Sequence, residues 1–230
     1  MAGSNKAPGF FGKLPGHGDF VTRRLPPQVR LCFDHWLQEG LVQSRIDLGE
    51  AWLATWLGSP LWRFAVGATV CGGQAWLGVM MPSHDRVGRC FPLVLMAPLD
   101  GTPRLHDCIA MHSGWFEQLE DLALSALGQE FSLEAFDASL VAAGGAPCSA
   151  VPDAPLAAQV RAAVAEERTL SVVALAPGAA PALADGTLAG RSAWWTTGSA
   201  SVAPCLAVSG GMPAPEIFAA FLDGRWEAYR

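Results

Sequence analysis

The stretch that decides the fold is WRFAVGATVCGGQAWLGVMMPSHDRVGRCFPLVLMA, residues 62–97. Glycines and a short polar segment separate three apolar runs within it: 63–70, 74–81 and 90–97. Gly72 and Gly73, between the first two runs, are typical of a tight hairpin turn. The pattern therefore predicts an antiparallel meander of three strands, in which the polar segment 82–89 connects the second strand to the third.

Helical and strand patterns surround this meander. Apolar residues recur every three or four positions from Val29 to Ile46, and Pro27 suits the first turn of a helix, so we expect one long helix there. A shorter helix around 52–57 continues the pattern. Further helices are predicted at 107–127, 133–142 (with Ser132 as its cap), 156–167 and 215–222. Further strands are predicted at 9–14, 170–175, 191–197 and 205–209.

These elements predict an α/β fold: a layered α/β/α sandwich around a mixed, largely antiparallel sheet. Helices on both faces of a sheet are the natural way to bury so many apolar runs. Residues 15–27 are expected to be an ordered loop. Glycines and prolines gather at 144–155, which suggests an internal linker. We therefore divide the chain into an N-terminal α/β lobe, 1–145, and a C-terminal α/β portion, 146–230, packed together as one globular body.

The composition excludes several classes of protein. Hydrophobic residues make up 51% of the chain and charged residues only 16%, which excludes intrinsic disorder. The net charge of −6 provides no basic field for nucleic acid. Glycines and prolines interrupt the two long uncharged stretches, so strands are expected there and no membrane insertion. Residues 1–12 contain no continuous apolar core and hence no secretory signal, so a cytoplasmic protein is predicted.

The cysteines favour a reducing compartment. The chain has six of them, none in a C-x-x-C pair: Cys32, Cys71, Cys90, Cys108, Cys148 and Cys205. Each lies in apolar surroundings. We therefore expect thiols that behave as small buried hydrophobic groups and no disulfide framework.

The segments that resemble enzymatic motifs lack the residue spacing that those motifs require. Lys13 is followed by Leu14, where a phosphate-binding loop needs Ser or Thr, and the glycines nearby lack dinucleotide-binding spacing. Ser83, His84 and Asp85 are consecutive, so their side chains diverge, and a turn that bonds its own backbone is favoured over a catalytic triad. No catalytic residue and no cofactor is expected.

One cluster has metal-ligating residue types: His106, Cys108 and His112. On a helix, positions 108 and 112 share a face, but position 106 lies about 160° away from 108. A structural role for these side chains is therefore favoured, and no metal site is predicted.

Several of the chain's few charged residues lie in two predicted loops. Their charged and aromatic residues are Asp19, Phe20, Arg23 and Arg24 in the first, and Asp85, Arg86 and Arg89 in the second. Arginines and carboxylates in close array either lock loops together or offer a planar polar surface to a partner, and both readings stay open. If the loops meet, we expect Asp19 to pair with an arginine of the second loop, or Asp85 with one of the first.

Trp194 and Trp195 are adjacent in a predicted strand, so their side chains should point to opposite faces. One of them is therefore expected to be exposed or to lie between the two lobes. Both are candidates for the partner-binding surface, together with the charged loops.

Five segments together carry a family resemblance: GFFGKLPGHGDFVTRRLP (9–26), FDHWLQEGL (33–41), PLWRF (60–64), GVMMPSHDRVGRCFPL (78–93) and SAWWTTG (192–198). The chain thereby resembles the TagF/ImpM family, associated with bacterial type VI secretion. Residues 101–190 carry no motif of that family.

The resemblance implies an α/β sandwich and a cytoplasmic accessory protein that restrains the secretion machine after translation. Family members are understood to bind the forkhead-associated scaffold protein of the system. Some are fused to a phosphatase of its threonine-phosphorylation branch, and no such segment is visible here, so any link would be made in trans. We expect a non-enzymatic binding module and a negative regulator.

Two other functions remain open at this stage. One is a small-ligand sensor or enzyme with a pocket near the 82–89 loop. The other is a structural subunit of the secretion machine itself.

Overall fold

The computed structural model describes residues 7–99, 108, 113–128, 130–146, 170–174 and 188–229. Its strands are β1 (Gly9–Gly12), β2 (Val21–Arg23), β3 (Trp62–Val66), β4 (Ala75–Met81), β5 (Leu93–Leu99), β6 (Leu170–Ala174), β7 (Arg191–Thr196) and β8 (Cys205–Gly210). Its helices are α1 (Pro27–Leu48), α2 (Trp52–Gly58), α4 (Ser113–Ser125), α5 (Leu133–Ala143) and α6 (Phe218–Asp223). Short 3-10 helices are η1 (Gly49–Ala51), η3 (Pro215–Ile217) and η4 (Trp226–Tyr229).

The strands form one sheet in the order β2-β1-β5-β4-β3-β7-β8-β6. Every pairing among the described strands is antiparallel. Strand β4 pairs with β3 on one side and β5 on the other, so the predicted three-strand meander is confirmed. Gly72 and Gly73, in the connection between β3 and β4, both have positive φ angles of 99° and 82°. The predicted turn therefore depends on the conformational freedom of glycine.

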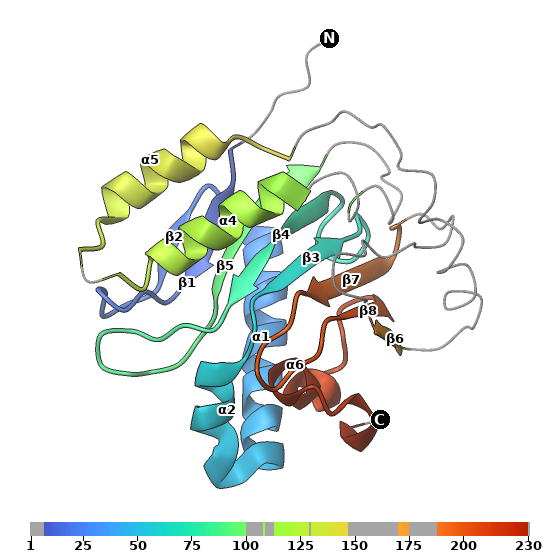
Figure 1. Ribbon diagram of the computed structural model, residues 1–230. Coiled ribbons are helices and arrows are strands. Elements are labelled where there is room, and N and C mark those ends of the chain that lie inside the picture. The colour runs from blue at the N-terminus through green and yellow to red at the C-terminus, as the bar shows by residue number, and fades with distance from the viewer. Residues whose placement is uncertain are drawn as a thin grey trace.

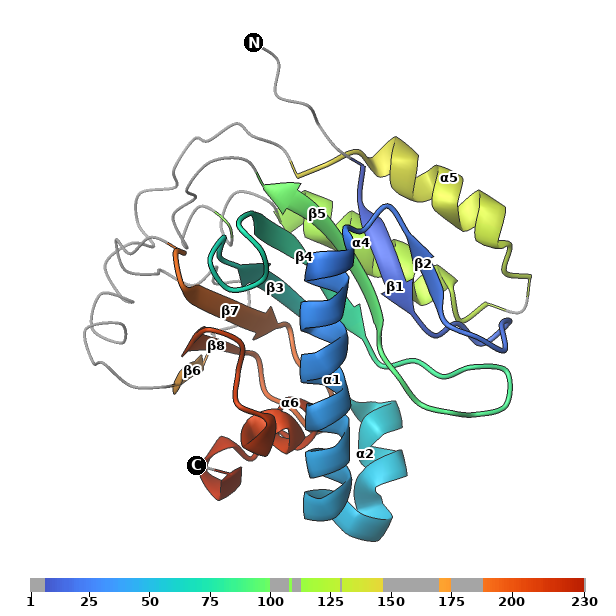
Figure 2. The same cartoon turned by 180° about the vertical axis from the view of Figure 1, so that it is seen from behind.

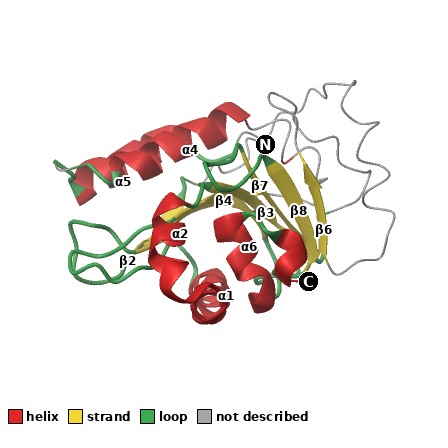
Figure 3. Ribbon diagram, turned by 60° about the horizontal axis from the view of Figure 1, so that its bottom comes forward, coloured by secondary structure: helices red, strands yellow, loops and turns green. Residues whose placement is uncertain are grey.

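Helices cover the sheet on both sides, which confirms the predicted α/β sandwich. Helices α1, α2 and α6 lie on one face, and α4 and α5 lie on the other (Figure 1; Figure 2 shows the reverse side). Figure 3 shows the layers edge-on. All seven residues of β4 are buried, because strands covered on both faces read as continuous apolar runs. The high hydrophobic content thus lies in a doubly covered sheet. Among the described helices, none combines the length and the apolar character needed to cross a bilayer.

Successive residues of β4 enter two different cores. Leu77 and Val79 lie in the core beneath α4 and α5, whereas Trp76 and Met80 lie in the core beneath α1 and α6. The first core contains a buried cation, Arg63, in the strand next to β4.

Arg63 fixes α4 to the sheet. Its Nε and Nη2 atoms each donate a hydrogen bond of 2.7 Å to the two carboxylate oxygens of Glu120 on α4. Such a two-point bond to a carboxylate restrains both position and orientation.

The boundaries differ from expectation in several places. The predicted loop 15–27 contains a short edge strand, β2, because residues 21–23 pair with β1. The closing helix is divided into η3 and α6. Ile46 belongs to the predicted apolar stripe of α1, yet its side chain is exposed.

Some predictions lie outside the described residues. They are the helix 156–167 and most of the linker 144–155. The division into two lobes at residue 145 stays a prediction. Within the described chain, β7 from the second portion pairs directly with β3 from the first.

The expectation of six free thiols was wrong for one pair. Cys32 in α1 and Cys71 in the β3–β4 connection form a disulfide, with their Cα atoms 5.7 Å apart. A sequence separation of 39 residues hides this pair, and the packing of α1 over the connection brings the two side chains together. Cys90 and Cys205 are free thiols, Cys108 is buried, and Cys148 lies outside the described residues. Burial raises the pKa of the Cys205 thiol to about 11, as expected for an inert buried thiol.

Gly40 controls the approach of α1 to α6. A Cβ atom at this position would overlap the ring of Phe218. We predict that Gly40→Ala lowers the free energy of unfolding by about 1–3 kcal/mol through overpacking, although alanine is the better helix former. Urea denaturation measures this change. The matched control is Gly58→Ala at the end of α2, where no atom lies within 4 Å. Equal stability of both variants would contradict the close packing of α1 on α6.

Candidate partner-binding site

The two charged loops meet at one end of the sheet. Strand β1 pairs with β5, so the loop that follows β1 lies beside the loop that precedes β5. The backbone N–H of Arg86 donates to the carbonyl oxygen of His17 at 2.9 Å. The Arg89 guanidinium donates to the carbonyl oxygen of Gly18 at 2.7 Å. Both loops therefore form one continuous surface.

Asp85 lies at the centre of this junction and is completely buried. Its Oδ2 atom lies 3.0 Å from Lys13 Nζ and 2.6 Å from Arg89 Nε. Its Oδ1 atom accepts hydrogen bonds from the backbone N–H groups of Val87, at 3.1 Å, and Arg89, at 2.8 Å. We call Lys13, Asp85 and Arg89 the Asp85 cluster.

The surroundings of Asp85 favour its charged form. Burial alone would raise its pKa, but the Arg89 backbone N–H, the Lys13 ammonium, the Arg89 side chain and the Val87 backbone N–H all lower it. The net result is a pKa well below the usual range of an aspartate. The carboxylate therefore stays ionised and holds the two loops together at neutral pH.

The structure contradicts the partners that were predicted for Asp85 and Asp19. Asp85 pairs with Lys13 from the first loop and with Arg89 from its own loop, rather than with an arginine of the first loop. Asp19 is exposed and forms no ion pair with any described residue. The sequence pattern contains no signal for this ion pair, because Lys13 falls inside the predicted strand 9–14, whereas β1 ends at Gly12.

Arg24 points away from the junction. It has a positive φ of 56°, which is uncommon for a residue other than glycine. Its Nε atom donates to the carbonyl oxygen of Pro8 at 2.9 Å, and its Nη1 atom lies 2.5 Å from Asp137 on α5. Arg24 therefore holds the end of β2 against α5 and contributes no free charge.

An exposed aromatic side chain lies beside the Asp85 cluster. The ring of Phe20 is 54% exposed, yet it makes a T-shaped contact with Phe91 at a centroid distance of 4.8 Å. The Lys13 ammonium lies 5.2 Å from the same ring centroid. Val87 is 69% exposed on the second loop. We call the exposed residues Phe20, Arg86, Val87 and Arg89 the basic–aromatic surface. Arg23 is also exposed, but it lies opposite Phe10, whose ring belongs to the core beneath α4 and α5, so it faces the other side of the sheet from Phe20.

The consecutive Ser83, His84 and Asp85 do not form a triad, as predicted. Ser83 Oγ donates to the carbonyl oxygen of Lys13 at 2.8 Å, and His84 Nδ1 lies 2.9 Å from the carbonyl oxygen of Asp85. Each side chain thus has a separate structural contact within or between the loops. In the part of the chain that the structure describes, no group of His, Cys, Asp and Glu is arranged for a metal ion. His106 and His112 lie outside that part.

Trp194 and Trp195 point to opposite faces, as predicted, but neither is exposed. Trp194 packs against Phe64 in the core beneath α1 and α6, with ring centroids 5.0 Å apart. Trp195 packs against Phe116 of α4, also at 5.0 Å. The expectation of an exposed aromatic was wrong because helices cover both sides of β7.

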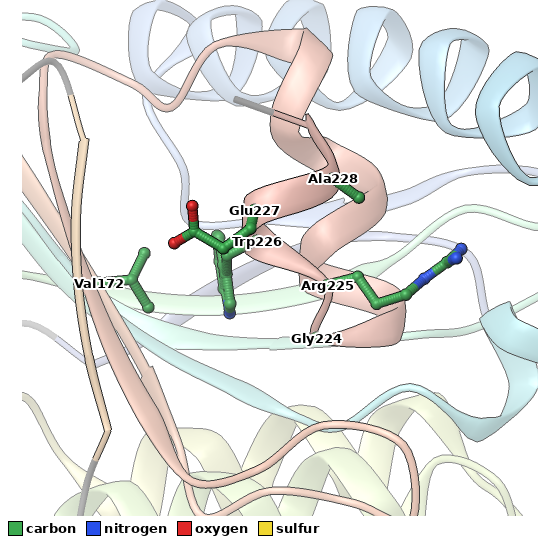
Figure 4. A pocket seen from close by; sticks show the side chains of 6 residues that line it. All are labelled: Val172, Gly224, Arg225, Trp226, Glu227 and Ala228. Carbon is green, nitrogen blue, oxygen red and sulfur yellow. The ribbon is translucent and has the colours of Figure 1, made fainter.

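A hollow of about 460 Å³ lies near the carboxyl end of the chain (Figure 4). Its lining residues are Val172, Gly224, Arg225, Trp226, Glu227 and Ala228. None of them belongs to the 82–89 loop, where a ligand pocket was the alternative prediction. Arg225 is already engaged, since it donates to Asp223 at 2.7 Å and to the Tyr229 hydroxyl at 3.0 Å.

Comparison with known proteins identifies the family. Residues 9–143 match the family described as "TagF N-terminal domain, Type VI secretion system-associated". The chain belongs to the TagF family. The matched segment contains both charged loops and the Asp85 cluster, and it makes this TagF protein a type VI secretion-associated protein.

A solved structure extends the comparison beyond the matched domain. The crystal structure of PA0076 from Pseudomonas aeruginosa PAO1 resembles this TagF chain with a TM-score of 0.76 at 38% sequence identity, over 95% of each chain. No curated protein matches the sequence significantly.

Replacing Asp85 should make the stability less dependent on pH. The folded-state pKa of Asp85 lies below its unfolded value of about 3.9, so its contribution is complete above that value and declines as the pH falls below about 4. We predict that Asp85→Asn destabilises the protein at pH 7, and that the difference from the parent shrinks as the pH falls toward 3. Urea denaturation across this range measures both effects.

The matched control for this prediction is Asp19→Asn, which changes an exposed aspartate in the neighbouring loop. It should leave the free energy of unfolding unchanged at pH 7. A difference between Asp85→Asn and the parent that stays constant from pH 7 to pH 3 would argue against a lowered pKa of Asp85 in the folded state.

Proposed function

We propose that this TagF protein is a cytoplasmic, non-enzymatic regulator that restrains type VI secretion after translation by binding the forkhead-associated scaffold protein. The observation that carries the proposal is the basic–aromatic surface, held rigid by the Asp85 cluster. A surface that is fixed before binding loses less conformational freedom on association.

The inner contacts of this surface explain why it suits a partner better than a substrate. Lys13 and Arg89 both pair with Asp85, so two cations already engage the buried carboxylate and leave it poorly placed to act as a general base. Ser83 and His84 are occupied by backbone carbonyl groups. The groups that remain outward, above all Phe20 and Arg86, are of the types that dominate protein interfaces.

Any link to the threonine-phosphorylation branch would then run through the scaffold. The regulator would occupy a scaffold surface, and the modifying enzymes would act in trans. The proposal requires no cofactor, metal or nucleic acid.

A deletion experiment tests the sign of regulation. If the protein restrains the machine, deletion of its gene raises secretion, and a pull-down from native cytoplasm recovers the scaffold. Loss of secretion after deletion of the gene would contradict the proposal that the protein is a repressor. Stable incorporation into purified secretion assemblies would instead indicate a structural subunit, and a thermal shift with one compound of a metabolite panel would indicate a ligand sensor.

A charge reversal tests the location of the interface. Arg86 is exposed on the second loop, and we predict that Arg86→Glu weakens scaffold binding at least about tenfold without changing the fold. Isothermal titration with the purified scaffold measures the affinity, and circular dichroism monitors the fold. The matched control is Arg191→Glu at the start of β7, next to Gly67 beyond the far end of β3. Equal affinities of both variants would remove Arg86 from the interface.

A further inference from the structure

We propose that the basic–aromatic surface receives an acidic protein segment whose apolar side chain packs on Phe20. This inference rests on the proposed function, because it specifies the chemistry that the scaffold must present. Three observations carry it: the exposed arginine beside the buried cluster, the immobilised aromatic ring, and the contrast with the charge of the whole chain.

The first observation is that the charges divide into an inner and an outer set. The charges of the inner set are paired with one another, because Lys13 and Arg89 both contact the buried Asp85. The outer set is open: Arg86 is exposed, and no carboxylate of the described residues lies within ion-pair distance of its guanidinium. Arg86 is nevertheless fixed at its backbone, whose N–H bonds to His17. An exposed guanidinium group that is held in this way can form two hydrogen bonds to a carboxylate of an acidic partner.

The second observation is the restraint on Phe20. Its ring makes a T-shaped contact with Phe91, and the Lys13 ammonium lies over the ring. Because Lys13 is itself held by Asp85 and by the carbonyl oxygen of Arg89, the ring position is set by the buried cluster. Exposed aromatic rings that are fixed in advance provide contact area at low entropic cost. Phe20 therefore serves as the apolar anchor of the surface.

The third observation is a reversal of charge. The whole chain carries a net charge of −6. Even with the Arg24–Asp137 pair set aside, residues 13–25 and 82–92 contain four Lys or Arg and two Asp. A local basic region on an acidic protein directs acidic partners to that region and repels them elsewhere. An acidic segment fits this surface, whereas a basic one meets the exposed Arg86 and Arg89.

A salt titration of scaffold binding tests the charge part of the inference. The affinity of the full chain for the purified scaffold should fall about tenfold or more between about 50 and about 300 mM NaCl, because screening weakens exposed ion pairs. Arg86→Glu should bind weakly and lose most of this salt dependence. Reversal of one acidic residue of the scaffold to arginine should restore the binding of Arg86→Glu.

The anchor is tested separately. Phe20→Ala should weaken scaffold binding about 30-fold, as for an aromatic hot spot, while the salt dependence stays as in the parent. Phe20→Leu should retain most of the affinity because it keeps an apolar side chain. The control is Val42→Ala, which removes a similarly exposed apolar side chain from the outer side of α1 and should bind as the parent does.

The outcomes separate this inference from the function on which it rests. The absence of any complex at low salt would overturn the proposed scaffold partner and this inference with it. A stable complex whose affinity ignores both salt and Phe20→Ala would overturn this inference alone. Self-association of the chain that Phe20→Ala abolishes would also overturn it, since the surface would then receive a second copy.

Discussion

The buried carboxylate of Asp85 has no access to water, so protein groups must supply all of its hydrogen bonds. A buried charge is tolerated only when it is paired and bonded in this way. The two amides of its own turn bond to one oxygen, and Lys13 and Arg89 approach the other. Because Lys13 comes from a different loop, the same requirement that keeps Asp85 ionised also fixes one loop on the other.

The sheet makes this meeting possible. Gly12 pairs with Leu93, so the end of β1 lies beside the start of β5. Gly12 has a φ of 133°, and a Cβ atom there would overlap the backbone of Pro92. A glycine is therefore required where β1 gives way to the loop, and Lys13 is the next residue. The geometry of one backbone position thus directs the ammonium group toward Asp85.

Local periodicity was enough to predict much of the fold but little of the site. The three-residue and four-residue spacing located α1 and α2, and the glycine-separated runs located β3, β4 and β5, because those signals arise within each segment. The ion pair of Lys13 with Asp85 depends on the pairing of β1 with β5, which no local pattern contains. The disulfide of Cys32 and Cys71 escaped prediction for the same reason.

The burial of both tryptophans shows a second limit of prediction from sequence. Alternation in a strand correctly sent Trp194 and Trp195 to opposite faces. Whether both faces are covered depends on where α1, α6 and α4 pack, and that is decided by tertiary contacts such as Trp36 with Trp194 and Phe116 with Trp195. Since helices occupy both faces of the sheet, a partner must approach the loops, the edges or the outer sides of helices. The charged loops are fixed in place by buried contacts, and this rigidity, more than their charge alone, makes them suitable for specific recognition.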